Sequence, residues 1–111
     1  MPTCKATASV DGQTIAETTE WEEVEGNVYF PPQAVRKDEY FTDTDLHTHC
    51  PWKGDASYYT ITVGGKKLDN AAWYYPTPKA EAQNIKDYVA FCKSLPGMLL
   101  LALRKPVNSR T

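Results

Sequence analysis

The feature that most constrains the fold is a pair of segments that meet at Gly64–Gly65. Residues 56–63, ASYYTITV, send alternate side chains to opposite sides, which is the period of a β-strand. Residues 66–76, KKLDNAAWYYP, continue in the same way and place Trp73 and Tyr75 on one side of a second strand. Two glycines between such runs predict a tight turn. The chain must therefore accommodate an antiparallel hairpin that carries aromatic rings on both faces.

Two shorter hairpins are predicted before this one. The first, KATASVDGQTIAET, turns at Asp11–Gly12, and the second, WEEVEGNVYF, turns at Gly26–Asn27. Pro31–Pro32 ends the second hairpin, because proline cannot donate a backbone hydrogen bond to a sheet. The next residues, PQAV, fit one short helical turn. Residues 37–50 are rich in Asp and Thr and have no clear period, so we interpret them as a long connection.

The sequence predicts one principal helix near residues 78–94. Thr77–Pro78 is a favourable start, because threonine caps a helix and proline suits its first position. Apolar side chains then recur at helical spacing and are expected to dock on the sheet: Ala82, Ile85, Val89 and Cys92. The predicted fold class is mainly β (α+β), with compact antiparallel sheets. A single β-rich domain is expected over residues 3–95, and the C-terminal tail, residues 96–111, fits either a last strand or a short helix.

Composition and charge narrow the classes of function. The chain has 111 residues, which allows one domain with one core. Its formal charge is −2 and its basic residues are scattered, so we expect no nucleic-acid partner. We expect no secretory signal and no membrane association, because the longest apolar run, residues 98–103, is far too short to span a bilayer. Three cysteines, Cys4, Cys50 and Cys92, include no CxxC pair, which favours free thiols and a cytoplasmic location.

The densest group of reactive side chains is HTHCPWKGDASYY, residues 47–59. His47 and His49 form an HxH pair that would share one face of a strand. A closed zinc site needs four ligands and the chain has no other histidine, so we expect neither a metal nor another cofactor. Cys50 follows directly, and His49 and Lys53 are close enough in sequence to lower the pKa of a nucleophilic thiol. The competing interpretation is a small buried side chain held before the next proline.

Carboxylates offer a second route to catalysis. Glu23 and Glu25 would share a strand face with Trp21, and an aromatic surface raises the pKa of a carboxyl group. Glu25 would then serve as a general acid or base. An enzyme that uses Cys50 as nucleophile or Glu25 as acid/base is one alternative for this chain, and the sequence leaves open whether it is an enzyme. No GxxxxGK[ST] or GxGxxG phosphate loop occurs.

The aromatic side chains are the strongest functional signal. Both faces of the central hairpin carry rings, so one face must be covered by other segments or left as an exposed aromatic surface. Such a surface, with Lys53 as a fixed positive charge and Glu25 as a fixed negative one, suits an apolar or cationic ligand. The predicted ligand-binding residues are Tyr29, Thr48, Trp52, Lys53, Gly54, Tyr58, Trp73 and Tyr75. The competing interpretation is a two-sided core whose second face is covered by the helix and the long connection.

Three blocks, VEGNVYFPPQAV, HTHCPWKGDASYYTI and AAWYYPTPKAEAQNIKDYVAF, resemble the domain of unknown function family 427, whose members are small proteins with no settled activity. The pattern covers about residues 3–94. The matching positions are Glu25–Asn27, Tyr29–Pro31, Thr48, Cys50–Pro51, Lys53–Gly54, Ala56, Tyr58–Tyr59, Ala71–Trp73, Tyr75–Pro76, Pro78 and Val89–Phe91. The resemblance implies a compact fold similar to the beta-tent group, in which sheets enclose a pocket.

Several family properties are not carried over. Related tent folds often hold zinc on two CxxC pairs, which this chain lacks. The family has also been given a nucleotidyltransferase-like label, but this sequence shows no paired-aspartate metal site with a glycine-serine loop. His47 and His49 lie outside the family pattern, and the segment after Lys93 departs from its usual ending. We predict that the chain binds a small molecule or a peptide-like group in an aromatic-lined pocket. A protein-interaction or self-association module, such as a homodimer, is the third alternative.

Overall fold

The computed structural model describes residues 5–103. Its strands are β1 (Lys5–Val10), β2 (Gln13–Thr18), β3 (Glu22–Val24), β4 (Asn27–Tyr29), β5 (Phe41–Cys50), β6 (Gly54–Val63), β7 (Lys66–Tyr74), β8 (Val89–Phe91) and β9 (Met98–Leu103). Its helical segments are η1 (Pro32–Ala34), α1 (Lys37–Tyr40) and η2 (Ala80–Ile85). The predominance of antiparallel strands confirms the predicted mainly β fold class.

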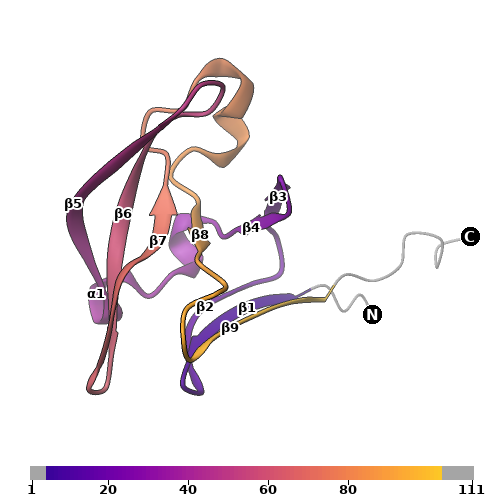
Figure 1. The fold of residues 1–111 in the computed structure, drawn as a ribbon. Coiled ribbons are helices and arrows are strands. Elements are labelled where there is room, and N and C mark those ends of the chain that lie inside the picture. Colours follow the sequence, from indigo (N-terminus) through magenta and orange to yellow (C-terminus); the bar gives the residue numbers. More distant parts are fainter. Residues whose placement is uncertain (1–4, 104–111) are drawn as a thin grey trace, which may run out of the picture.

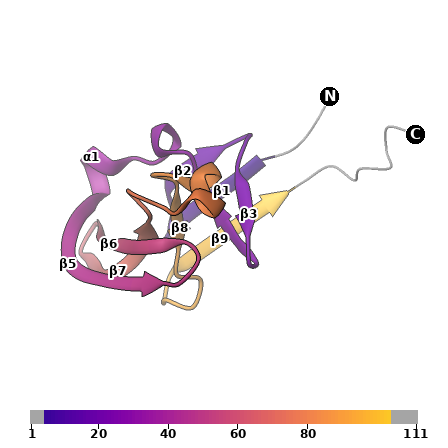
Figure 2. The same cartoon turned by 90° about the horizontal axis from the view of Figure 1, so that it is seen from above.

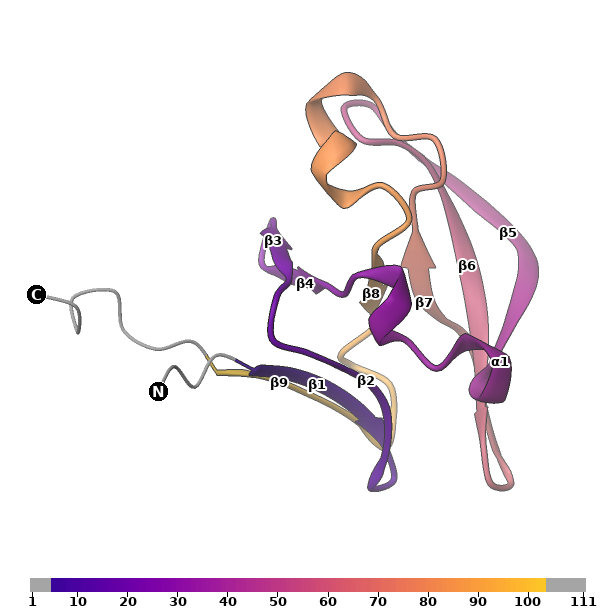
Figure 3. The same ribbon diagram turned by 180° about the vertical axis from the view of Figure 1, so that it is seen from behind.

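The strands form three sheets. One has the order β5-β6-β7-β8, a second has the order β2-β1-β9, and β3 and β4 form a separate hairpin. The four-stranded sheet lies on one side of the molecule and the three-stranded sheet on the other (Figures 1 and 3). Strand β8 is the edge of the four-stranded sheet that lies nearer to the three-stranded sheet. No helix within residues 5–103 has the length and apolar character needed to cross a membrane.

The central hairpin, β6–β7, is confirmed. Tyr58 lies opposite Trp73, and Tyr59 lies opposite Ala72. Tyr59 and Ala72 pack in one hydrophobic core, whereas Tyr58 and Trp73 pack in another. The alternation predicted from the sequence is therefore confirmed, since neighbouring rings lie on opposite faces of the sheet.

The prediction of a long connection over residues 37–50 is wrong. The first four residues form α1, and the remaining ten form β5, an edge strand paired with β6. Seven of the ten β5 residues are exposed and none is buried, so no alternation of apolar residues marks the strand in the sequence. The register shifts between Asp43 and His47, an irregularity of the kind that protects an exposed edge from pairing with another chain.

The prediction of a principal helix near residues 78–94 is also wrong. The chain forms the short 3₁₀ segment η2, which is interrupted at Ala82, where φ is −120° and ψ is 22°. Asp87 then adopts a left-handed conformation with φ of 63°, which no continuing helix allows. Strand β8 follows, with all three residues buried and paired with β7. Pairing and burial of Val89 and Phe91 outweigh the helical spacing, as tertiary packing commonly outweighs local propensity.

Residues 98–103, MLLLAL, for which the sequence allowed either a strand or a helix, form strand β9. It pairs with β1 over its whole length, and β1 also pairs with β2 through the confirmed turn at Asp11–Gly12. β9 is one edge of this sheet, and Leu99 and Leu101 on it are about half exposed, at 53% and 51%. Residues 104–111 of the predicted tail and residues 3–4 of the predicted domain lie outside the described residues.

Two hydrophobic cores lie on opposite faces of the four-stranded sheet. The first joins this sheet to the three-stranded sheet, through side chains such as Ile15, Ile61 and Phe91. The second core lies between the four-stranded sheet, η2 and the β3–β4 hairpin, and its buried members are Tyr29, Ala56, Tyr75, Ala82, Ile85 and Ala90. Seen from above, the η2 coil lies over β8 (Figure 2). The second face is thus covered by short segments instead of a sheet or a long helix.

Candidate functional site: a lysine beside an aromatic wall

A pocket of about 340 Å³ opens on the second face of the β6–β7 hairpin. It is lined by Lys53, Tyr58, Asn70, Trp73, Tyr75 and Cys92. Tyr58 and Trp73 are cross-strand partners, so their rings share one face of the sheet. Four of the eight predicted ligand-binding residues, Lys53, Tyr58, Trp73 and Tyr75, therefore come together at one concave site.

Lys53 is the charged residue of this pocket, and it is only 6% exposed. Its Nζ donates a hydrogen bond to Glu25 Oε1 at 2.5 Å and lies 5.4 Å from the ring centroids of both Trp52 and Tyr75. These contacts compensate for the removal of the ammonium from water. Burial is the largest single effect and lowers the pKa of Lys53. The hydrogen bond to Glu25 and the charge interactions with Tyr29, Tyr75 and Glu25 together outweigh it and leave that pKa above its ordinary value. Lys53 is a permanent positive charge at neutral pH.

Glu25 reaches Lys53 from the tip of the β3–β4 hairpin. The turn is formed by Glu25–Gly26, one position before the predicted Gly26–Asn27, and both of its residues have positive φ, 55° and 82°. A type I′ turn requires this geometry, which is uncommon for a glutamate. Hydrogen bonds from Lys53 and from Trp52 Nε1, the latter at 3.2 Å, hold the pKa of Glu25 below its ordinary value. The hairpin tip therefore presents a carboxylate to the lysine.

The turn that carries Lys53 is fixed by its neighbours. Gly54 has a φ of 111°, and a Cβ at this position would lie 3.3 Å from the Thr77 carbonyl oxygen. The Lys79 amide donates to the Lys53 carbonyl at 2.9 Å, and the Lys79 ammonium donates to the Pro51 carbonyl at 2.6 Å. Gly54 does not line the pocket. It allows close approach of the two backbones, which holds the base of the lysine in place.

Three other predicted ligand-binding residues contact the pocket residues without lining the pocket. Tyr29 is fully buried, and its hydroxyl accepts a hydrogen bond from Trp73 Nε1 at 3.1 Å. The Thr48 hydroxyl lies 3.0 Å from the Tyr58 hydroxyl. Trp52 is 38% exposed and its ring lies beside the Lys53 ammonium. Together they fix the orientation of the rings and of the charge.

The predicted nucleophile, Cys50, is partly buried and packs against the second core. The neighbouring histidines bond elsewhere. His49 Nδ1 lies 2.7 Å from Asp55 Oδ1, and His47 Nδ1 lies 3.1 Å from Ser57 Oγ. Each histidine is therefore engaged across the β5–β6 hairpin. Within residues 5–103, no three side chains of His, Cys, Asp or Glu gather where they could hold a metal ion.

Two residues of the pocket lining, Asn70 and Cys92, were not predicted. Asn70 adopts φ of 52° at an irregularity in the β6–β7 register, a conformation in which asparagine is enriched. Cys92 reaches the pocket because its amide donates to the Ala71 carbonyl at 2.8 Å and so continues the pairing of β8 with β7. An asparagine inside a predicted strand was a usable signal for Asn70, because asparagine is enriched at positive φ. Cys92 gave none, because its position depends on β8 replacing the predicted helix.

Comparison with known proteins agrees with the sequence blocks. Residues 3–96 match the family model NTP_transf_9, described as a domain of unknown function (DUF427). The chain therefore belongs to the DUF427 family, and the predicted family is confirmed. A comparison with curated proteins finds no match.

Proposed function

We propose that this protein binds a small molecule in the pocket beside Lys53. The observation that carries the proposal is a buried ammonium that lines a pocket whose other large side chains are aromatic. A volume of about 340 Å³ lies within the range of small-molecule sites, and a few polar groups among aromatic walls are their usual composition.

The charge of Lys53 narrows the chemistry of the ligand. Its ammonium has three N–H groups and donates one to Glu25, which leaves donors for an oxygen of a ligand. Tyr58, Trp73 and Tyr75 offer ring surface beside it. Glu25 balances this charge but does not line the pocket, so a cationic ligand, which the aromatic surface alone would suit, would face the lysine and not the glutamate. The ligand class favoured is a planar molecule that carries a carboxylate or carbonyl oxygen.

The geometry disfavours proton donation by Glu25. Its pKa is held below the ordinary value by Lys53 and Trp52, so it is ionised at neutral pH, and both of its oxygens accept hydrogen bonds. Nucleophilic catalysis by Cys50 stays a prediction of the sequence. Alkylation by iodoacetamide tests it, because a catalytic thiolate reacts much faster than Cys92.

The homodimer also stays a prediction. Sedimentation over a range of protein concentrations tests it, because the mass of a self-associating chain rises with concentration.

A thermal-shift screen tests ligand binding. The wild-type protein is heated with a panel of aromatic carboxylates and with the neutral amide of each, since a bound ligand raises the melting temperature by mass action. We expect a carboxylate to raise the melting temperature more than its amide does. Lys53→Met should abolish the difference between acid and amide.

Two variants separate ligand binding from protein stability. Lys86→Met removes an exposed lysine on the adjacent segment and should leave the response unchanged. Cys92→Phe places a ring in the pocket lining without altering Lys53, and it should abolish the response to every member of the panel. A response that survives both Lys53→Met and Cys92→Phe would place the ligand elsewhere and reject the proposal.

A further inference from the structure

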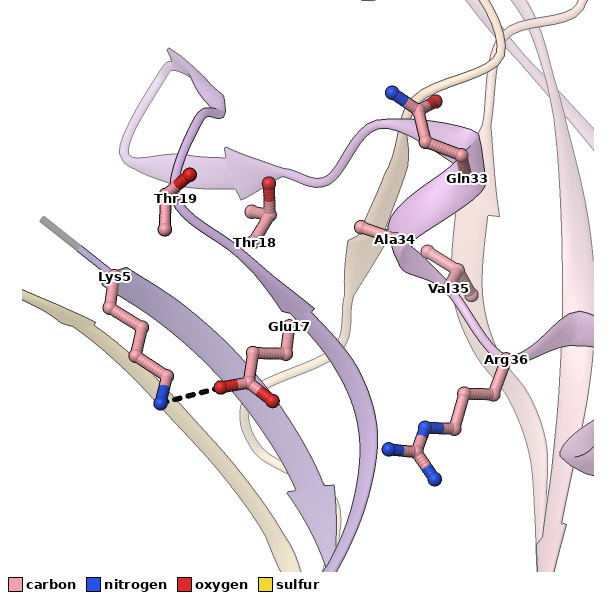
Figure 4. A pocket seen from close by; sticks show the side chains of 8 residues that line it. All are labelled: Lys5, Glu17, Thr18, Thr19, Gln33, Ala34, Val35 and Arg36. Carbon is pink, nitrogen blue, oxygen red and sulfur yellow. Dashed lines mark ion pairs between the residues drawn. The ribbon is translucent and has the colours of Figure 1, made fainter.

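The structure contains a second and larger pocket. It has a volume of about 610 Å³ and shares no lining residue with the pocket beside Lys53. Figure 4 shows its two walls: Lys5 and Glu17 project from β1 and β2, and the segment from Gln33 to Arg36 forms the opposite side. The predicted functional residues include none of these side chains.

The charges in this pocket do not cancel. Lys5 Nζ and Glu17 Oε2 form an ion pair at 2.5 Å, which neutralises both groups. Arg36 lies across the pocket, and within residues 5–103 its guanidinium has no hydrogen-bond or ion-pair partner. Asp38 and Glu39 line a neighbouring hollow, and neither is ion-paired with Arg36. The pocket therefore carries one unpaired positive charge from its described residues.

The backbone that carries Arg36 is anchored. Val35 is 7% exposed and forms a β-bridge with Ala16 of β2. The Arg36 amide donates to the Ile15 carbonyl at 2.9 Å. The backbone at Arg36 is therefore already ordered, and a ligand has only side chains to order, which keeps the entropic cost of binding small.

We propose that this pocket binds the oxyanion of a small organic molecule, either a carboxylate or a phosphate group. A guanidinium presents a planar fork of donors that matches two oxygens of either group. Gln33 and Thr19 add exposed polar groups nearby, and Val35 and Ala34 add an apolar surface for the carbon part of the ligand. A volume of about 610 Å³ exceeds what a bare anion would fill.

Titration followed by nuclear magnetic resonance tests this site. The probes are inorganic phosphate and succinate, each added separately to the full chain at constant ionic strength, and the signal followed is the Nε–H group of Arg36. We expect a saturable shift of this signal with at least one probe. A response to phosphate alone assigns a phosphoryl group, and a response to succinate alone assigns a carboxylate.

Substitutions at neighbouring positions provide the control. Arg36→Gln should weaken binding by about tenfold to a hundredfold, the range for losing a hydrogen bond to a charged group. Arg36→Lys keeps the charge without the fork and should lie between that variant and the wild type. Lys37→Gln removes the same charge one residue away, outside the pocket lining, and should change binding by no more than about twofold. Equal losses in Arg36→Gln and Lys37→Gln, or no saturable shift in the wild type, would overturn the proposal.

Discussion

The two faces of the β6–β7 hairpin carry similar side chains but are covered in different ways. On the core face, Ile61 of the hairpin and Phe91 of the adjacent strand β8 are fully buried beneath the three-stranded sheet. On the pocket face, Tyr58 and Trp73 are only partly buried, because a hairpin of two three-residue strands and a short 3₁₀ segment cover them. A sheet fills the space above its neighbour with side chains, whereas short irregular segments leave some of it open. The second covering, not the composition of the face, creates the pocket.

The largest expected difference between the two faces is in stability. Phe91→Ala removes a ring that meets Phe30 at 5.4 Å and Phe41 at 6.0 Å between centroids. We expect a loss of about 3–5 kcal/mol in the free energy of unfolding, measured by urea denaturation. Leu101→Ala, at a half-exposed position of β9, should stay within about 0.5 kcal/mol. Equal losses in the two variants would contradict the assignment of a closed core to this face.

A smaller effect is expected at the turn behind the pocket. Gly54→Ala introduces a Cβ about 3.3 Å from the Thr77 oxygen at a φ of 111°. The expected loss in the free energy of unfolding is about 1–3 kcal/mol. Gly12→Ala also has positive φ, 87°, but meets open space, so it should cost less. If the two variants cost the same, contact between residues 51–54 and 77–79 does not restrain the lysine.

Two tyrosine hydroxyls on the pocket face differ in burial, so removing each of them tests a different part of that face. Tyr29→Phe leaves the Trp73 indole N–H without its acceptor inside the second core, and it should cost about 1–2 kcal/mol of unfolding free energy. Tyr58→Phe removes an exposed contact with Thr48 and should cost less than about 0.5 kcal/mol. Chemical denaturation measures both. A larger loss in Tyr58→Phe would reverse this division of the face.

The smallest expected difference between the two faces is in how their contributions to stability depend on pH. The pKa of Glu25 is lowered from 4.5, so its stabilising contribution is present above that value and is lost as the pH falls through the lowered pKa. The pKa of Lys53 is raised from 10.5, so its contribution is present below that value and is lost as the pH rises through the raised pKa. Burial also raises the pKa of Tyr59 on the core face, so the alkaline loss belongs to both faces. The acid loss that Glu25 causes belongs to the pocket face.

Melting temperatures measured against pH test this assignment. Glu25→Gln should lower the melting temperature at neutral pH and converge with the wild type in acid, where the wild-type carboxylate is protonated. The same depression at every pH would show that the Glu25 carboxylate does not stabilise the pocket face by its charge.

The sequence predicted those parts of the fold that a pattern within one segment reports. The central hairpin was predictable because its alternation and its two glycines agree with each other. Strand β5 was not, because backbone pairing at a sheet edge leaves no period in exposed side chains. The segment after Pro78 was mistaken for a helix because the burial of Val89 and Phe91 against β7 depends on distant residues that local spacing does not report.

The candidate site was predictable to a similar degree. Alternation placed Tyr58 and Trp73 on one face, and the family blocks directed attention to Lys53. The adjacent Trp52 and Lys53 exchange their expected environments, since the ring is exposed and the ammonium is buried. That exchange depends on Glu25, which lies far away in the sequence and is positioned by a turn with positive φ. Local pattern carries no information on such a contact.

The pairing of β1 with β9 has a consequence for how the chain acquires its structure. Lys5 pairs with Leu103, so the three-stranded sheet closes only when both ends of residues 5–103 are available. During synthesis, β1 and β2 emerge early and must keep one edge open until β9 has been translated. Contacts between such distant segments slow folding, because closing a long loop costs conformational entropy before the contact is gained. The β5–β6–β7 meander pairs strands that are neighbours in the sequence, so its shorter loops close at a lower entropic cost and it can form before β9 joins β1.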